Sequence, residues 1–194
     1  MSRSDSTTAK KERNKTIRWV VTIFFVTIFV SGMFSFASNE IMADSTIPVA
    51  FIILFTIILI GIIFDIIGVA VTSADEKPFH SMAARKVPGA QESIRLLRNA
   101  ERVSSICNDV VGDICGVVSG SASAAIAVQV LNHFEFTFPA VISLVMSALV
   151  AGLTVGGKAI GKTFAIKSCT NIVHSVGKII WGLHNFPDIL KKKK

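Results

Sequence analysis

Long apolar runs dominate the pattern of hydrophobic and polar positions along the chain. Four of them are long enough to cross a membrane, whose hydrocarbon core of about 30 Å needs about 20 helical residues. They cover residues 17–37, 47–72, 103–131 and 138–155. Because backbone polar groups inside a bilayer must be satisfied within their own segment, each run is predicted to be a helix. The sequence therefore predicts an all-α membrane protein with about four transmembrane helices.

The polar segments between these runs define the predicted domain organisation. A core transmembrane domain covers residues 47–157 and includes a helical cytoplasmic loop at 73–103. A basic tail at 1–16 and an additional transmembrane helix at 17–37 precede the core. An amphipathic belt helix and a basic C-terminal tail are predicted within 158–194.

The first apolar run has a second interpretation. Its basic start and the small residues in Ser35-Phe36-Ala37 also fit a signal peptide with a cleavage site. The run is longer than the apolar core of a usual signal peptide, which favours a retained helix. Cleavage would leave the other three helices oriented as before.

Composition and charge agree with a membrane protein. Of the 194 residues, 51% are hydrophobic and 17% are charged, which excludes disorder and is unusual for a soluble domain. The net charge of +7 therefore does not indicate a nucleic-acid partner. No Lys or Arg occurs in the loops at 38–46 and 132–137. The positive-inside rule predicts a multi-pass protein of the cell membrane with both termini and the long middle loop in the cytoplasm.

Two cytoplasmic segments are predicted to form amphipathic helices beside the bilayer. The first lies within 78–102 and is interrupted near Pro88. The second covers 159–184, with Trp181 as an interfacial anchor. Basic side chains on such helices attract anionic lipid headgroups. The residues expected to face the lipid are Arg95, Arg98 and Arg102.

Aspartates within the apolar runs carry the strongest chemical signal. Asp65 lies inside the second run, and Asp109 and Asp113 are one turn apart early in the third. An ionised carboxylate inside a bilayer is costly, so such a residue is a hypothesis for a functional site. Carboxylate and amide oxygens suit a hard cation such as Mg²⁺ or Ca²⁺. The predicted ligands are Asp65, Asp109 and Asp113, with Asn108 and Ser119 as weaker candidates.

Other interpretations of these carboxylates stay open. Asp109 is two turns from Arg102, so it could be solvated at the cytoplasmic interface or paired with that residue. All three carboxylates could also be neutralised by protonation instead of by a metal ion.

Glycines mark two further positions. Gly112, Gly116 and Gly120 form a repeated G-x-x-x-G, which allows helices to approach closely, either within one chain or at a homodimer seam. The segment 156–163 matches the letters of a phosphate-binding loop, but it follows a predicted membrane helix instead of a strand. We expect the helix to unwind at Gly156 and Gly157 and to expose carbonyls beside an ion pathway. No catalytic arrangement is recognisable, so no enzymatic activity is expected.

Several of these segments together resemble the transmembrane domain of the CNNM/CorB family, which is associated with Mg²⁺ transport. The resemblance covers about residues 55–180. Four segments carry it: Phe64–Val71, Gly89-Ala90, Asn108–Asp113 against a family Gly-Asn-x-x-x-Asn, and Gly157–Lys162 against a family Gly-Glu-x-x-Pro-Lys. The resemblance implies Mg²⁺ as ligand, divalent-cation transport and a homodimer.

The chain also departs from this family. Asp65 replaces a Ser, Asp109 and Asp113 replace Asn, and Lys158 replaces a Glu. The usual pair of CBS domains does not follow, so a separate regulatory protein is a possible partner.

Two functions are therefore open. The first is transport or binding of Mg²⁺ by an intramembrane carboxylate cluster, with charge-compensating or gating roles for Lys158, Lys162, Gly156 and Gly157. The alternative is a non-transporting membrane scaffold in which Lys158 neutralises the aspartates. A membrane enzyme or lipid carrier that uses Arg95, Arg98 and Lys162 has less support.

Overall fold

The computed structural model describes residues 3–43, 45–133 and 138–191, and every regular element in these ranges is a helix. Four stretches are long and apolar enough to cross a membrane, which confirms the predicted fold class. They are Ile17–Ser38, Ile47–Ser73, Ala100–His133 and Pro139–Lys167. The elements are α1 (Arg3–Ala43), α2 (Ile47–Ser73), α3 (Lys77–Ala84), α4 (Ala90–Arg98), α5 (Ala100–Ser105), the π-helix η1 (Ile106–Gly112), α6 (Asp113–His133), α7 (Pro139–Lys167) and α8 (Cys169–Lys191).

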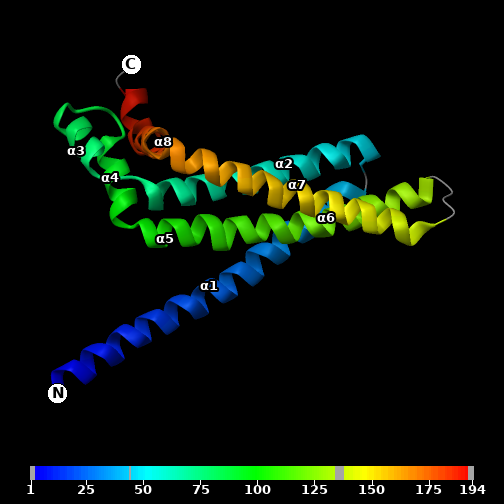
Figure 1. Cartoon of the computed structure of the whole chain (residues 1–194), viewed down its shortest axis with the longest axis horizontal. Coiled ribbons are helices and arrows are strands. Elements are labelled where there is room, and N and C mark those ends of the chain that lie inside the picture. The colour runs from blue at the N-terminus through cyan, green and yellow to red at the C-terminus, as the bar shows by residue number, and fades with distance from the viewer. Residues whose placement is uncertain (1–2, 44, 134–137, 192–194) are drawn as a thin grey trace.

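Helices α2, α6 and α7 lie side by side and form a three-helix bundle (Figure 1). Helix α1 crosses α6 at an angle and diverges from the bundle toward its N-terminus (Figure 1). Helices α3, α4 and α8 gather at one end of the bundle, and the α1–α2 and α6–α7 connections lie at the other (Figure 1). The three spans of the bundle therefore run between an end covered by three further helices and an end with two connections.

Prolines begin two of the spans, as the sequence predicts. Pro48 and Pro139 each lie in the first helical turn, where the missing N–H removes no hydrogen bond. The predicted interruption near Pro88 is also confirmed, because α3 ends at Ala84 and α4 begins at Ala90.

Two apolar clusters hold the bundle together. The first joins α2, α6 and α7 toward the end with the two short connections, through Ala50, Leu54, Ile58, Ala122, Ile126 and Val150. The second lies at the opposite end and includes Ala70, Val71, Phe79, Ile94, Leu97, Ala165 and Val173. Asp65 lies on α2 between the parts of the helix that contribute to these two clusters, and it is itself buried.

Helices α4 and α8 cross with their backbones in close contact. Gly89 has φ +84°, and a Cβ at this position would collide with the backbone of Lys178. The Ser93 hydroxyl lies 3.2 Å from the Val173 carbonyl oxygen of α8 and 2.9 Å from that of Gly89. Small residues thus fix the amphipathic α8 against the end of the bundle.

Helix α7 differs from the sequence expectation. It continues without interruption to Lys167, so the predicted unwinding at Gly156 and Gly157 is wrong. A Cβ at Gly157 or Gly161 would collide with Ile62 or Ile66 of α2, so these glycines allow close packing of the two helices. Keeping the helix intact also satisfies its backbone hydrogen bonds inside the bilayer.

The belt helix begins later than expected. Helix α7 ends at Lys167, and after Ser168 α8 starts at Cys169, whereas the belt was expected to begin near residue 158. At the other end of the chain, α1 is one helix from Arg3 to Ala43, so part of the predicted basic tail continues directly into the first span.

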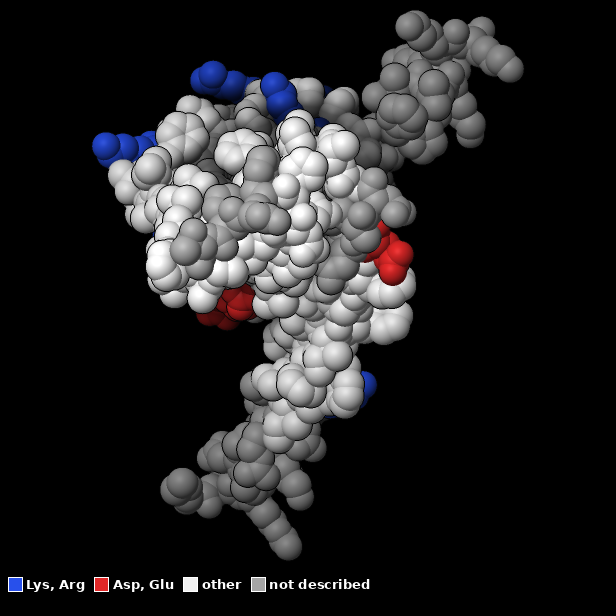
Figure 2. All heavy atoms as spheres, turned by 90° about the vertical axis from the view of Figure 1, so that its right-hand side faces the viewer, with Lys and Arg blue, Asp and Glu red and all other residues white. Residues whose placement is uncertain are grey.

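Basic residues gather at the end formed by α3, α4 and α8. That end carries Lys77, Arg85, Lys86, Arg95, Arg98 and Lys178. Figure 2 looks onto the opposite end, which presents mainly uncharged side chains, with Lys and Arg only near the margins. The molecule has the charge asymmetry that the positive-inside prediction requires, and the orientation in the membrane stays a prediction.

Candidate functional site between three spans

A stripe of three residues on α2 forms one wall of the candidate site. Gly61, Asp65 and Gly68 follow one another at helical spacing, and all are buried. A Cβ at Gly61 would lie 2.9 Å from the Cys115 Cβ, and a Cβ at Gly68 would collide with the Asn108 amide. The Asp65 carboxylate is therefore placed on α2 between two points of close contact with the third span.

The third span contains a π-helix, η1, where it passes this stripe. π-Helical segments are rare and frequently occur at functional sites. The Asn108 Nδ2 donates a hydrogen bond to Ser104 Oγ at 3.2 Å. The Asn108 Oδ1 is buried and accepts no hydrogen bond from the described part of the chain. The segment thus brings one unused amide oxygen against α2.

Besides the Asn108 Oδ1, a second buried oxygen without a hydrogen bond from the described residues belongs to Asp65. The residue is 4% exposed, and its Oδ2 has no hydrogen-bond donor among the described residues. The Lys162 Nζ of α7 lies 3.9 Å from this oxygen. A direct charge-assisted hydrogen bond would be about 2.7–2.9 Å long, so the ion pair leaves the oxygen without a hydrogen bond. Burying a hydrogen-bond acceptor without a donor costs free energy of folding unless a cation or a water molecule binds to it.

Two lysines of α7 supply positive charge on the opposite wall. Lys158 is half-buried, and its Nζ would lie 3.4 Å from a Cβ at Gly112, the last residue of η1. Lys162 follows one turn later, and its side chain is 54% exposed. The expected neutralising residue was Lys158, whereas the ion pair with Asp65 is formed by Lys162.

Asp109 and Asp113 do not join Asp65. Both are exposed, and no three His, Cys, Asp or Glu side chains within the described ranges lie close enough to hold a metal ion together. The structure therefore does not bring the three predicted aspartate ligands together. Asn108 and Gly112 lie on the inward face of the third span, the face toward α2 and α7. Asp109 and Asp113 each come one residue later, so they fall on the outward face. Asp109 lies on the surface of the described bundle, and its solvation at the interface stays a prediction.

Ser119 belongs to a different region. Its hydroxyl donates to the Gly116 carbonyl oxygen at 2.9 Å. With Gly116, Gly120 and Ser123 it lines a cavity of about 180 Å³ between α6 and α7. A Cβ at Gly116 or Gly120 would meet nothing within 4 Å in the described structure, whereas Gly112 faces Lys158. The G-x-x-x-G repeat is therefore only partly used for contacts within this chain.

The three arginines at the α4–α5 end have different surroundings. Arg95 forms an ion pair with Glu92 at 3.2 Å. Arg98 and Arg102 line a surface recess of about 440 Å³, and the Arg102 guanidinium lies over the Trp19 ring at 5.9 Å.

Comparisons with known protein families, with curated proteins and with solved structures find no match. The resemblance to CNNM/CorB consequently stays a prediction that rests on the residue pattern. The functional argument depends on the chain's own residues.

Proposed function

We propose that this protein handles a divalent cation such as Mg²⁺ in the cell membrane, at a site made by Asp65 and Asn108. The observation that carries the proposal is the pair of buried oxygens, Asp65 Oδ2 and Asn108 Oδ1, neither of which accepts a hydrogen bond from the described residues. Asn108 contacts α2 at Gly68, which follows Asp65 by three residues on the same buried stripe. Mg²⁺ binds such oxygens and usually keeps several waters, so one or two protein ligands are sufficient.

Lys162 acts in this proposal as a tethered cation that competes with the metal ion. Its ammonium lies 3.9 Å from the Asp65 Oδ2, and more than half of its side chain is exposed. The lysine can therefore leave the carboxylate and remain hydrated. Entry of Mg²⁺ would displace the ammonium from Asp65, and departure of Mg²⁺ would let it return. The nearby charge of Lys158 weakens binding, because like charges repel more strongly where water is scarce.

Thermal unfolding of the purified full-length protein tests the proposal. A ligand that binds only the folded state raises the melting temperature, and the shift grows with the logarithm of the ligand concentration above Kd. We expect Mg²⁺ to raise the melting temperature of the wild type, to raise it more in Lys162→Gln, and to have no effect on Asp65→Asn. Asp113→Asn is the matched control, because this aspartate is exposed and should keep the wild-type response. An undiminished response in Asp65→Asn would contradict the proposal.

A second candidate function is a non-transporting membrane scaffold in which Lys162 neutralises Asp65 permanently. The ion pair itself favours it, together with the lack of a three-carboxylate site among the described residues. In this case neither the wild type nor Lys162→Gln responds to Mg²⁺. Lys162→Gln is then destabilised, because it leaves a buried carboxylate without a counter-charge.

The homodimer and the separate regulatory protein remain expectations from the resemblance. Both functions are compatible with cytoplasmic termini.

A further inference from the structure

The axes of α1 and of the start of the third span diverge, and this angle between the two helices is called the wedge. Helix α1 contacts α6 but diverges from α5 toward its own N-terminus (Figure 1). None of the most apolar 18-residue window of α1 is buried, compared with 39% of the corresponding window in the third span. Ile106, one turn beyond Arg102, is 46% exposed. Both helices therefore expose apolar side chains at this level of the molecule.

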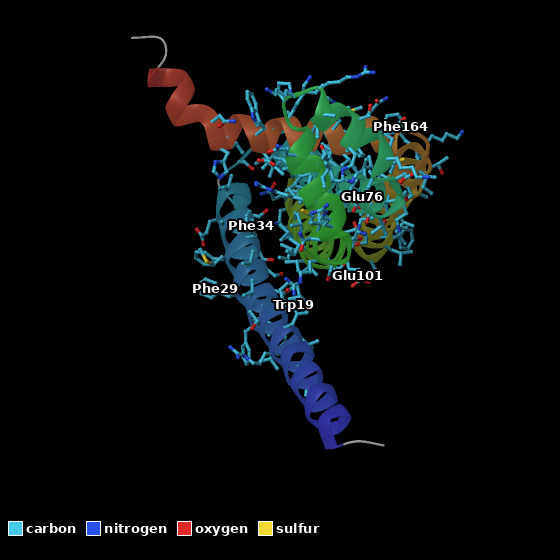
Figure 3. The ribbon with its side chains drawn as sticks, turned by 90° about the vertical axis from the view of Figure 1, so that its left-hand side faces the viewer. Trp19, Phe29, Phe34, Glu76, Glu101 and Phe164 are labelled. Carbon is cyan, nitrogen blue, oxygen red and sulfur yellow. The ribbon has the colours of Figure 1, made fainter. Side chains whose placement is uncertain are left out.

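One contact bridges the wedge at its basic end. The Arg102 guanidinium of α5 lies over the Trp19 ring of α1 at 5.9 Å, a distance typical of a cation–π interaction. Figure 3 shows Trp19 on the side of α1 toward the bundle and Phe29 on the opposite side. Trp19 and Arg102 are each the third residue of a candidate span, so they mark the same membrane boundary. Tryptophan is enriched at that level of a bilayer.

The surface recess beside this contact carries two arginines that no described carboxylate neutralises. Arg98 and Arg102 line it together with Leu97, Asn99, Ala100 and Glu101. Arg95 is paired with Glu92, whereas neither Arg98 nor Arg102 has an ion pair with a described carboxylate. Arg98 ends α4 and Arg102 lies in α5, but both line this recess. Guanidiniums bind phosphate in a bidentate manner, and two of them can share one phosphate.

We propose that one anionic phospholipid binds in the wedge. Its phosphate lies between Arg98 and Arg102, and an acyl chain follows α1 beside η1. Charge complementarity and the position at the membrane boundary identify a lipid headgroup as the source of the phosphate. The lipid fills the space that separates α1 from the bundle and fixes the angle of α1. This binding does not depend on the cation site.

Native mass spectrometry of the full-length protein in detergent tests the proposal, with phosphatidylglycerol and phosphatidylcholine of identical acyl chains. We expect one phosphatidylglycerol to remain bound to the wild type in preference to phosphatidylcholine. Arg98→Gln and Arg102→Gln should each weaken its retention by about fivefold, the usual contribution of one basic residue near a membrane surface. Arg95→Gln is the matched control and should leave retention unchanged.

Three outcomes would overturn the proposal. The first is equal retention of the two lipids, and the second is an equal loss in Arg95→Gln. The third is displacement of the lipid by inorganic phosphate at equal concentration, which would indicate a site for free phosphate.

Tryptophan fluorescence in vesicles provides a second readout, so that the test does not depend on one variant. In a Trp181→Phe background Trp19 is the one remaining tryptophan. Brominated phosphatidylglycerol should quench Trp19 more than brominated phosphatidylcholine at the same mole fraction. Arg98→Gln should remove this difference and Arg95→Gln should keep it. Identical quenching by both lipids would contradict the proposal.

Discussion

The inward and outward faces of the third span carry similar polar residues with different surroundings. Asn108 faces α2 and keeps a buried, unpartnered oxygen, whereas the neighbouring Asp109 is exposed. On α2, Asp65 is buried between two glycines that contact the third span. Position relative to the neighbouring helix, and not residue type, therefore decides which polar group can form an intramembrane site. A difference of one residue moves a side chain about 100° around a helix.

The largest effect is expected where a side chain is added to the inward face. Gly68→Val places atoms where the Asn108 amide lies, so it should destabilise the protein by about 1–3 kcal/mol or more. Gly116→Ala is the control, because a Cβ there meets nothing within 4 Å in the described structure. Thermal unfolding in detergent measures both variants. Equal melting temperatures would show that the α2–η1 contact is looser than described.

A smaller effect is expected from the inward-facing hydroxyl that joins α4 to α8. Ser93→Ala removes the hydrogen-bond donor 3.2 Å from the Val173 carbonyl oxygen and should cost about 1 kcal/mol. Ser175→Ala is the outward-facing control, since among the described residues its hydroxyl bonds to the Asn171 carbonyl oxygen of its own helix. Hydrogen exchange of the α8 amides should accelerate in the first variant alone. Unchanged exchange in both would mean that Ser93 does not hold α8 in place.

The smallest change in stability is expected when the aspartates are replaced and the protein is measured in the absence of Mg²⁺. Asp65→Asn removes a buried charge and leaves behind an exposed lysine, so the protein should gain up to about 1 kcal/mol. Asp113→Asn, on the outward face, should change stability by less than about 0.5 kcal/mol. Chemical unfolding in metal-free buffer measures both differences. A clear loss of stability in Asp65→Asn would mean that the carboxylate is mainly structural.

Hydropathy predicted most of the fold because each span must be apolar along most of its length. The second span was expected at 47–72 and occurs at Ile47–Ser73, and Pro139 begins α7 one residue from its expected start. The end of α7 was missed because Lys158 and Lys162 were taken to lie beyond the membrane helix. In the structure they continue α7, where long side chains place their charges at the polar site.

The candidate site was only partly predictable. The apolar surroundings of Asp65 were sufficient to indicate a buried carboxylate, and the structure agrees. The inward face of the third span depends on its packing against Gly61 and Gly68, which hydropathy does not reveal. Glycines three and four residues from a buried aspartate were the available signal for this contact. No comparable signal in the sequence marked the π-helix.

The position of a bound divalent cation tests the central claim most directly. Mn²⁺ prefers the same oxygen ligands as Mg²⁺ and gives an anomalous X-ray signal. In crystals of the full-length protein soaked with Mn²⁺, the account predicts a peak between Asp65 and Asn108, with the Lys162 ammonium displaced from the carboxylate. A peak beside Asp109 or Asp113, or no peak while Lys162 remains paired with Asp65, would contradict it.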